Sequence, residues 1–229
     1  MKRMLMIRRE YLAEIIGTFA LVFAGTGAIV VNDVSGGVVT HAGIALTFGL
    51  IVMAMIYALG DVSGAHLNPA VTIAFYLAGR TKREIVVPYL AAQLFGAIAA
   101  SLLLKILFSG HMTLGATIPN GPLWQSFILE VVLTFLLMLV VLQVSSGSKE
   151  VGTLAGIAIG GVVTLEAMFA GPICGASMNP ARSIAPAILC GQWSVFLSVW
   201  IYIAAPILGA VLSIPIHNQL YKPTKSVPS

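Results

Sequence analysis

Long charge-free runs of apolar residues dominate this chain. A helix needs about 20 predominantly apolar residues to cross the hydrocarbon core of a bilayer. Once trimmed at glycine, proline and polar clusters, the runs predict six membrane-spanning helices, at residues 11–31, 40–59, 85–108, 123–143, 152–169 and 193–216.

Two further apolar segments, residues 68–77 and 179–189, are too short to cross the membrane. About ten residues at 1.5 Å per residue reach only about 15 Å, which is half of the hydrocarbon core. We therefore predict two half-helices that enter the membrane and stop near its midplane.

The whole pattern occurs twice along the chain. Residues 63–70 read Ser-Gly-Ala-His-Leu-Asn-Pro-Ala, and residues 174–181 read Cys-Gly-Ala-Ser-Met-Asn-Pro-Ala. Glu14, four residues before a Thr-Phe pair, returns as Glu130 before another such pair. Each copy holds three predicted spans, so the second copy must enter from the opposite side of the membrane. The two repeats are therefore inverted.

The predicted fold is an all-α membrane protein with an inverted repeat of 3+3 transmembrane helices and two re-entrant half-helices that meet at their Asn-Pro-Ala triplets. A single transmembrane channel domain covers residues 1–229, with repeat 1 at about 10–108 and repeat 2 at about 123–216. Irregular backbone at the midplane is tolerated only where it is buried in protein or lines a water-filled cavity. A pore between the triplets is the simplest explanation.

The two triplets carry the candidate pore chemistry: Asn68, Pro69, Ala70, Asn179, Pro180 and Ala181. Asn followed by Pro suits the start of a helix, because the Asn oxygen can accept a first-turn N–H and Pro lacks only a donor that would have no partner. The Asn NH₂ groups are then expected to be free and to face the lumen beside two positive helix ends. Water would pass with its oxygen toward these donors, while cations and proton relay are disfavoured.

Arg182 is a charged residue within an apolar region, which by default indicates a functional role. It follows Asn179 by three residues, so the two side chains should share one helix face and one lumen. We expect Arg182 to offer donors to a permeating oxygen atom and to add to the barrier against cations.

The remaining polar residues near the triplets have structural interpretations. Glu14 and Glu130 are interpreted as buried acceptors that brace the N–H groups of the re-entrant loops, in preference to proton-relay groups. Glu166 fits either a pore-rim group or a polar contact between helices, and the sequence does not decide between them. We expect the backbone carbonyls that face the pore to come from Gly64, Ala65, His66 and Gly175.

Composition and charge restrict the function further. With 59% hydrophobic and 9% charged residues and a mean hydropathy of +1.00, the chain leaves no room for an ordinary soluble domain. The net charge of +4 reflects short basic clusters and does not indicate nucleic-acid binding.

By the positive-inside rule we expect both termini to be cytoplasmic, in a multi-pass protein of the cell (plasma or inner) membrane. The basic residues behind this orientation are Lys2, Arg3, Arg8, Arg9, Arg80, Lys82, Arg83, Lys149, Lys222 and Lys225.

The sequence does not support an enzyme. Cys174 and Cys190 are not spaced as a metal or disulfide motif, and the chain has no phosphate-binding loop and no nucleophile–base set. We therefore predict no cofactor and no metal.

Taken together, the two triplets, the inverted duplication and Glu14 resemble the aquaporin, or major intrinsic protein, family over residues 14 to about 216. The resemblance implies a right-handed bundle assembled as a homotetramer in membrane lipid, with one pore in each subunit. Residues 169–172 and 175–183, together with Trp-Ile-Tyr-Ile at 200–203, look like the nodulin-like branch.

The resemblance also implies a narrow outer selectivity filter made by Phe48, Ala167, Ala176 and Arg182. Strict water channels of the family typically carry His at the position of Ala167, and a methyl group there widens the filter and removes a donor. Ser183 and Ala187, in contrast, resemble the water-channel pattern. We expect passive permeation of water and of small uncharged solutes, such as glycerol or undissociated metalloid acids, with protons and ions excluded.

Two other classes of protein remain open from the sequence. A non-conducting junction or scaffold protein of the same fold would have a sealed pore, which the small side chains of Ala167 and Ala176 disfavour. A secondary transporter also uses inverted repeats and broken helices. It would need a coupling site, and candidate carboxylates are few.

Overall fold

The structure is a computed structural model that describes residues 8–146 and 152–221. Its described part is all helical, and six of its helical segments are long and apolar enough to cross a membrane. This confirms the predicted fold class. Five basic residues used to predict the orientation lie outside the described residues: Lys2, Arg3, Lys149, Lys222 and Lys225.

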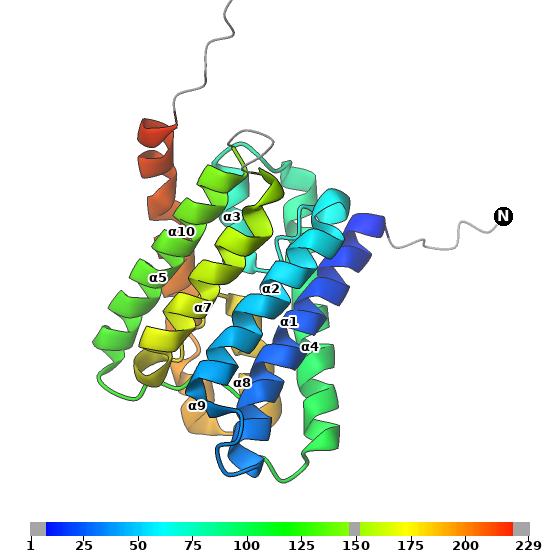
Figure 1. Cartoon of the computed structure of the whole chain (residues 1–229), viewed down its shortest axis with the longest axis vertical. Helices are drawn as coiled ribbons and strands as arrows, with labels where there is room; N and C mark the ends of the chain where they lie inside the picture. Colours follow the sequence, from blue (N-terminus) through cyan, green and yellow to red (C-terminus); the bar gives the residue numbers. More distant parts are fainter. Residues whose placement is uncertain (1–7, 147–151, 222–229) are drawn as a thin grey trace, which may run out of the picture.

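The long helices follow the predicted order. They are α1 (Arg9–Val34), α2 (Thr40–Ser63), α4 (Arg83–Leu107), α5 (Leu123–Val144), α7 (Ala155–Cys174) and the pair α9 (Trp193–Ser198) and α10 (Ile201–Leu220). In Figure 1, α1 begins and α10 ends on the same side of the bundle, as an even number of crossings requires.

Several helices, α1, α2, α7 and α10 among them, end beyond their predicted ends, and α2 and α7 show the reason. Trimming at glycine and proline ended the predicted spans at residues 59 and 169, whereas α2 runs to Ser63 and α7 to Cys174. Pro172 is accommodated inside α7, as prolines often are in membrane helices. Both helices end where the next residue, Gly64 or Gly175, takes the left-handed conformation that closes a helix.

The last predicted span is divided in two. Between α9 and α10, the N–H of Val199 donates to the carbonyl of Phe196, and the N–H of Ile203 donates to the carbonyl of Trp200. These shorter, i to i−3 hydrogen bonds tighten the backbone at residues 199–200, which stay in the right-handed helical region.

The half-helices are α3 (Pro69–Leu77) and α8 (Pro180–Cys190). They lie toward opposite ends of the bundle in Figure 1, so their N-termini point toward its middle. The inverted arrangement predicted from the repeat accounts for this placement, because each half-helix follows a span that runs in the opposite direction.

Glycines let the long helices approach closely enough to enclose the site. A Cβ added at Gly49 of α2 would lie 2.3 Å from the carbonyl oxygen of Gly160 of α7. Gly96 meets the Ile15 carbonyl at 2.3 Å, and Gly209 in the second repeat meets the Val131 carbonyl at 2.2 Å. Small residues at helix crossings are the usual means of close packing in membranes.

Candidate functional site

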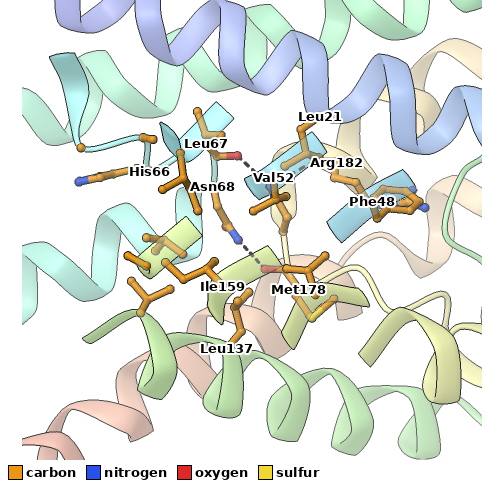
Figure 2. Close-up of a pocket in the computed structure, with 18 of the residues that line it drawn as sticks. Leu21, Phe48, Val52, His66, Leu67, Asn68, Leu137, Ile159, Met178 and Arg182 are labelled. Atoms are coloured by element: carbon orange, nitrogen blue, oxygen red, sulfur yellow. Dashed lines mark hydrogen bonds between the residues drawn. The ribbon is translucent and has the colours of Figure 1, made fainter. Parts of the chain in front are cut away.

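A cavity runs through the middle of the bundle between the two half-helices (Figure 2). Apolar side chains of four long helices make most of its wall, and the two re-entrant loops supply the polar groups. None of the described carboxylates lines it. The apolar wall includes Leu21, Val52, Ile56, Leu137, Val141, Ile159 and Val163.

Each triplet starts a half-helix. The Oδ1 atom of Asn68 accepts the N–H of Ala70 at 2.9 Å, and the Oδ1 atom of Asn179 accepts the N–H of Ala181 at 3.0 Å. Pro69 and Pro180 occupy the first helical position and are buried. Both caps thus have the geometry that the Asn-Pro pair favours.

The Asn amide groups differ from the sequence-based expectation that they would be free. The Nδ2 atom of Asn68 donates to the carbonyl of Met178 at 2.7 Å, and the Nδ2 atom of Asn179 donates to the carbonyl of Leu67 at 2.8 Å. Figure 2 shows the first of these bonds crossing between the repeats. An NH₂ group has two N–H donors, so each amide uses one donor to join the halves and keeps one for the lumen.

The re-entrant loops contain strained backbone. Ala65 and Leu67 have φ values of 45° and 52°, and their counterparts Ala176 and Met178 have 41° and 53°. Non-glycine residues held in this left-handed region cost about 1–3 kcal/mol each and persist only where their surroundings fix them. The loops therefore need firm anchors.

Glu14 anchors the first loop. Its Oε1 atom accepts hydrogen bonds from the Ser63 hydroxyl at 2.7 Å and the His66 N–H at 2.9 Å. Its Oε2 atom accepts from the Leu67 N–H at 2.7 Å and the Gln93 amide at 2.8 Å. All four donors converge on one buried carboxylate.

Glu130 occupies the equivalent place in the second repeat. It accepts the N–H of Ser177 at 2.7 Å and the N–H of Met178 at 2.8 Å. The side chain is fully buried. Sequence reasoning did not identify Gln93 as a partner of Glu14, although a lone amide in an apolar span is a signal that could have indicated it.

The loop residues expected to present carbonyls divide into two groups. Gly64, Ala65 and His66 line the cavity. Gly175 does not line the cavity, which on that side is bordered by Ala176 and the two residues that follow it. Gly175 instead packs against Thr117 of the outer loop, where an added Cβ would lie 3.1 Å from a Thr117 methyl group.

The four residues assigned to the filter by resemblance all line this cavity. Arg182 is only 2% exposed, and its guanidinium carbon lies 5.0 Å from the ring centroid of Phe48. Its Nη1 atom donates to the carbonyl of Gly115 at 2.9 Å. The small side chains of Ala167 and Ala176 border the same space. Nothing in the sequence indicated that Gly115 accepts from Arg182, because every residue has a backbone carbonyl.

Glu166 lies apart from this group. Its neighbour Ala167 lines the cavity, but Glu166 does not, and its side chain is 2% exposed. Neither carboxyl oxygen has a hydrogen-bond partner among the described residues. Of the two interpretations left open by the sequence, the pore-rim one does not fit this position.

Comparison with known proteins places these features in a family. The sequence pattern of the major intrinsic protein family matches residues 1–217. "Aquaporin NIP1-3" of Oryza sativa subsp. japonica is 48% identical over 215 residues, which are 93% of this chain and 73% of the rice protein. "Nodulin-26" of Glycine max is 42% identical over 211 residues, covering 92% of this chain and 77% of the soybean protein.

A solved structure agrees with the sequence comparisons. The aquaglyceroporin from Plasmodium falciparum superposes with a TM-score of 0.82 at 25% identity, covering 93% of this chain and 96% of the parasite chain. The chain therefore belongs to the major intrinsic protein, or aquaporin, family, in its nodulin-26-like branch, and is a membrane channel for water and small neutral solutes.

Proposed function

We propose that the channel conducts water together with uncharged solutes of about the size of glycerol, including undissociated metalloid acids, and excludes protons and ions. The observation that carries this proposal is the small side chain of Ala167, which lines the same cavity as Phe48 and Arg182. Ala167 contributes a methyl group there, so Phe48 and Arg182 bound a wider opening than an imidazole would leave.

The lining of the cavity suits a solute with one polar and one apolar side. Val52, Leu137 and Val163 offer no hydrogen bonds, whereas Asn68 and Asn179 offer amide donors on the loop side. A small polyol or a neutral hydroxy acid can turn its hydroxyl groups to the loops and its remaining surface to the apolar wall. A hydrated ion would lose its water against that wall at a high free-energy cost.

Electrostatics near the triplets support the exclusion of cations. The N-termini of α3 and α8 approach each other at Asn68 and Asn179, and a helix N-terminus carries about half a positive charge. Arg182 adds a full positive charge, and no described carboxylate lines the cavity. This arrangement also disfavours a cation-coupled secondary transporter.

We further propose that the protein is a homotetramer with one pore per subunit, in the cell membrane and with both termini cytoplasmic. Large apolar side chains are exposed on every long helix and need lipid or a neighbouring subunit as cover. Arg9, Arg80 and Arg83 lie on the side where α1 begins, and the loop at residues 108–122 on the other side has no Lys or Arg.

Stopped-flow light scattering on proteoliposomes tests the proposal. Purified protein is compared with protein-free vesicles of the same lipid under an osmotic water gradient and under inward gradients of glycerol and boric acid. We expect all three permeabilities to exceed the lipid background. Fast water with background glycerol would reject the wide filter, and background values for all three would favour the non-conducting scaffold.

A further inference from the structure

The outer loop at residues 108–122 holds the filter arginine through its backbone. Gly115 presents the carbonyl that accepts the Arg182 guanidinium at 2.9 Å. It has φ +69°, and an added Cβ would lie 2.7 Å from the carbonyl oxygen of Thr26 in α1. Farther along, the Thr117 hydroxyl donates to the hydroxyl of Ser183 at 2.8 Å. The position of Arg182 therefore depends on where this loop sits.

The side chain of His111, near the start of that loop, contacts backbone N–H groups farther along the loop and the end of α1. Its Nδ1 atom accepts the N–H of Leu114 at 3.0 Å and lies 3.4 Å from the N–H of Thr113. Its Nε2 atom lies 3.1 Å from an Asp33 carboxyl oxygen at the end of α1. The imidazole is 8% exposed, and the carboxylate it meets is 52% exposed.

These contacts specify the tautomer of the ring. Two N–H donors point at Nδ1, so this atom can only be an acceptor, and the proton of a neutral imidazole must be on Nε2. The Nε2–H group then donates to Asp33. One side chain thus uses both ring nitrogens, and its Nδ1 contact holds Leu114, the buried residue directly before Gly115.

We propose that His111 is a positioning residue of the filter: as a neutral imidazole it fixes the Leu114 N–H and the end of α1, and so holds the Gly115 carbonyl against Arg182. This inference rests on the proposed function, in which Arg182 and Phe48 bound the opening of the filter. His111 does not line the cavity.

The same geometry gives the filter a dependence on external pH. A protonated ring carries N–H groups at both nitrogens, and its Nδ1–H would point at the N–H groups of Thr113 and Leu114. Among the described residues, Asp33 of α1 is the one ionisable group that forms a hydrogen bond or ion pair with the ring. Lys105 of α4 donates instead to the carbonyl of Leu189. Protonation of Nδ1 would remove the acceptor of both N–H groups, so an imidazolium at this position releases the loop from the ring.

The test is the ratio of glycerol to water permeability in proteoliposomes at two external pH values, about 7.5 and about 5. The variants are His111→Ala, His111→Asn and the control His41→Asn. Asn at 111 places an acceptor oxygen where Nδ1 stands but has no titrating group. His41→Asn removes another histidine, whose ring contacts the Met168 carbonyl at 2.6 Å.

We expect the wild-type ratio to rise about threefold on external acidification, because a loosened Arg182 no longer limits solute size. His111→Ala should show the raised ratio at both pH values. His111→Asn should keep the low ratio at both, and His41→Asn should respond as the wild type does.

Two outcomes would overturn the inference and leave the proposed function intact. In the first, the wild type conducts but its ratio of glycerol to water permeability does not change with pH. In the second, His111→Asn retains the pH response. If His111→Ala fails to fold, the comparison of the wild type with His111→Asn decides alone. A wild type that passes neither water nor glycerol would overturn the proposed function, and the inference with it.

Discussion

Glu14 in the first repeat accepts four hydrogen bonds, two of them from side chains, whereas Glu130 in the second accepts two backbone N–H groups. The hydroxyl of Ser63 is replaced by the thiol of Cys174, a weaker donor that is directed to the carbonyl of Ala170 at 3.5 Å. Gln93 has Pro206 at its equivalent position, and proline has no side-chain donor. The same loop shape is therefore braced more densely in the first repeat.

In the half-helices, by contrast, it is the second repeat that carries the more polar side chain on the cavity. Three residues after the Asn of each triplet, α3 carries Val71 and α8 carries Arg182, and both line the cavity. The one charged residue proposed for the filter thus belongs to the second repeat. Its half-helix α8 is held partly by the outer loop, through the Gly115 carbonyl that accepts from Arg182 and the contact between Thr117 and Ser183. An inverted repeat supplies two equal scaffolds, and the side chains give the first the denser bracing and the second the arginine that we propose for the selectivity filter.

Removing the two carboxylates gives the largest effects and tests the difference in bracing. Glu14→Ala leaves four donors without an acceptor, and Glu130→Ala leaves two backbone donors. Each buried unpaired donor costs about 1–3 kcal/mol, so Glu14→Ala should lose roughly twice the stability. Fluorescence-detected size-exclusion chromatography after heating in detergent measures this. A lower melting temperature for Glu130→Ala than for Glu14→Ala would contradict the comparison.

Arg182→Val makes the second half-helix like the first at this position. It removes the positive charge from the filter, so we expect proton and cation leak to rise at least about tenfold, which corresponds to only about 1.4 kcal/mol of barrier. A pH-sensitive dye inside proteoliposomes under a proton gradient measures the leak. The matched control is Val71→Ala, which changes the equivalent residue and no charge. An unchanged proton leak in Arg182→Val would show that the half-helix N-termini alone are enough to exclude protons.

Gln93→Leu makes the first repeat more like the second and has the smallest effect. The variant removes the amide bonds to Glu14 at 2.8 Å and to Thr72 at 2.9 Å, while Glu14 keeps its other three donors. We expect a loss of about 1–2 kcal/mol, seen as a modest drop in melting temperature, with water permeability largely retained. A loss as large as that of Glu14→Ala would mean that Gln93, and not the carboxylate, is the main anchor.

Much of this arrangement could be predicted from the sequence because it depends on local signals. Apolar runs indicate the spans, Asn-Pro indicates a capped helix start, and the repeated triplet indicates the inversion. The exact ends of α2 and α7 could not be predicted, because glycine and proline within a membrane helix look like the end of one.

The remaining features depend on contacts between distant segments. The bond from Asn68 to Met178 joins positions 110 residues apart, and its acceptor is a carbonyl that every residue possesses. The same holds for Gly115 and Arg182. His111 could be recognised only as a histidine in an outer loop, since Asp33 becomes its partner through folding alone.

The width of the filter at Ala167 is tested most directly by Ala167→His, measured against the wild type for water and glycerol in the same proteoliposome preparation. An imidazole there would narrow the opening beside Phe48 and Arg182 and add a donor for water. We predict that glycerol permeability falls at least about tenfold while most water permeability is retained. Equal loss of both, or loss of neither, would contradict the assignment of Ala167 to the filter.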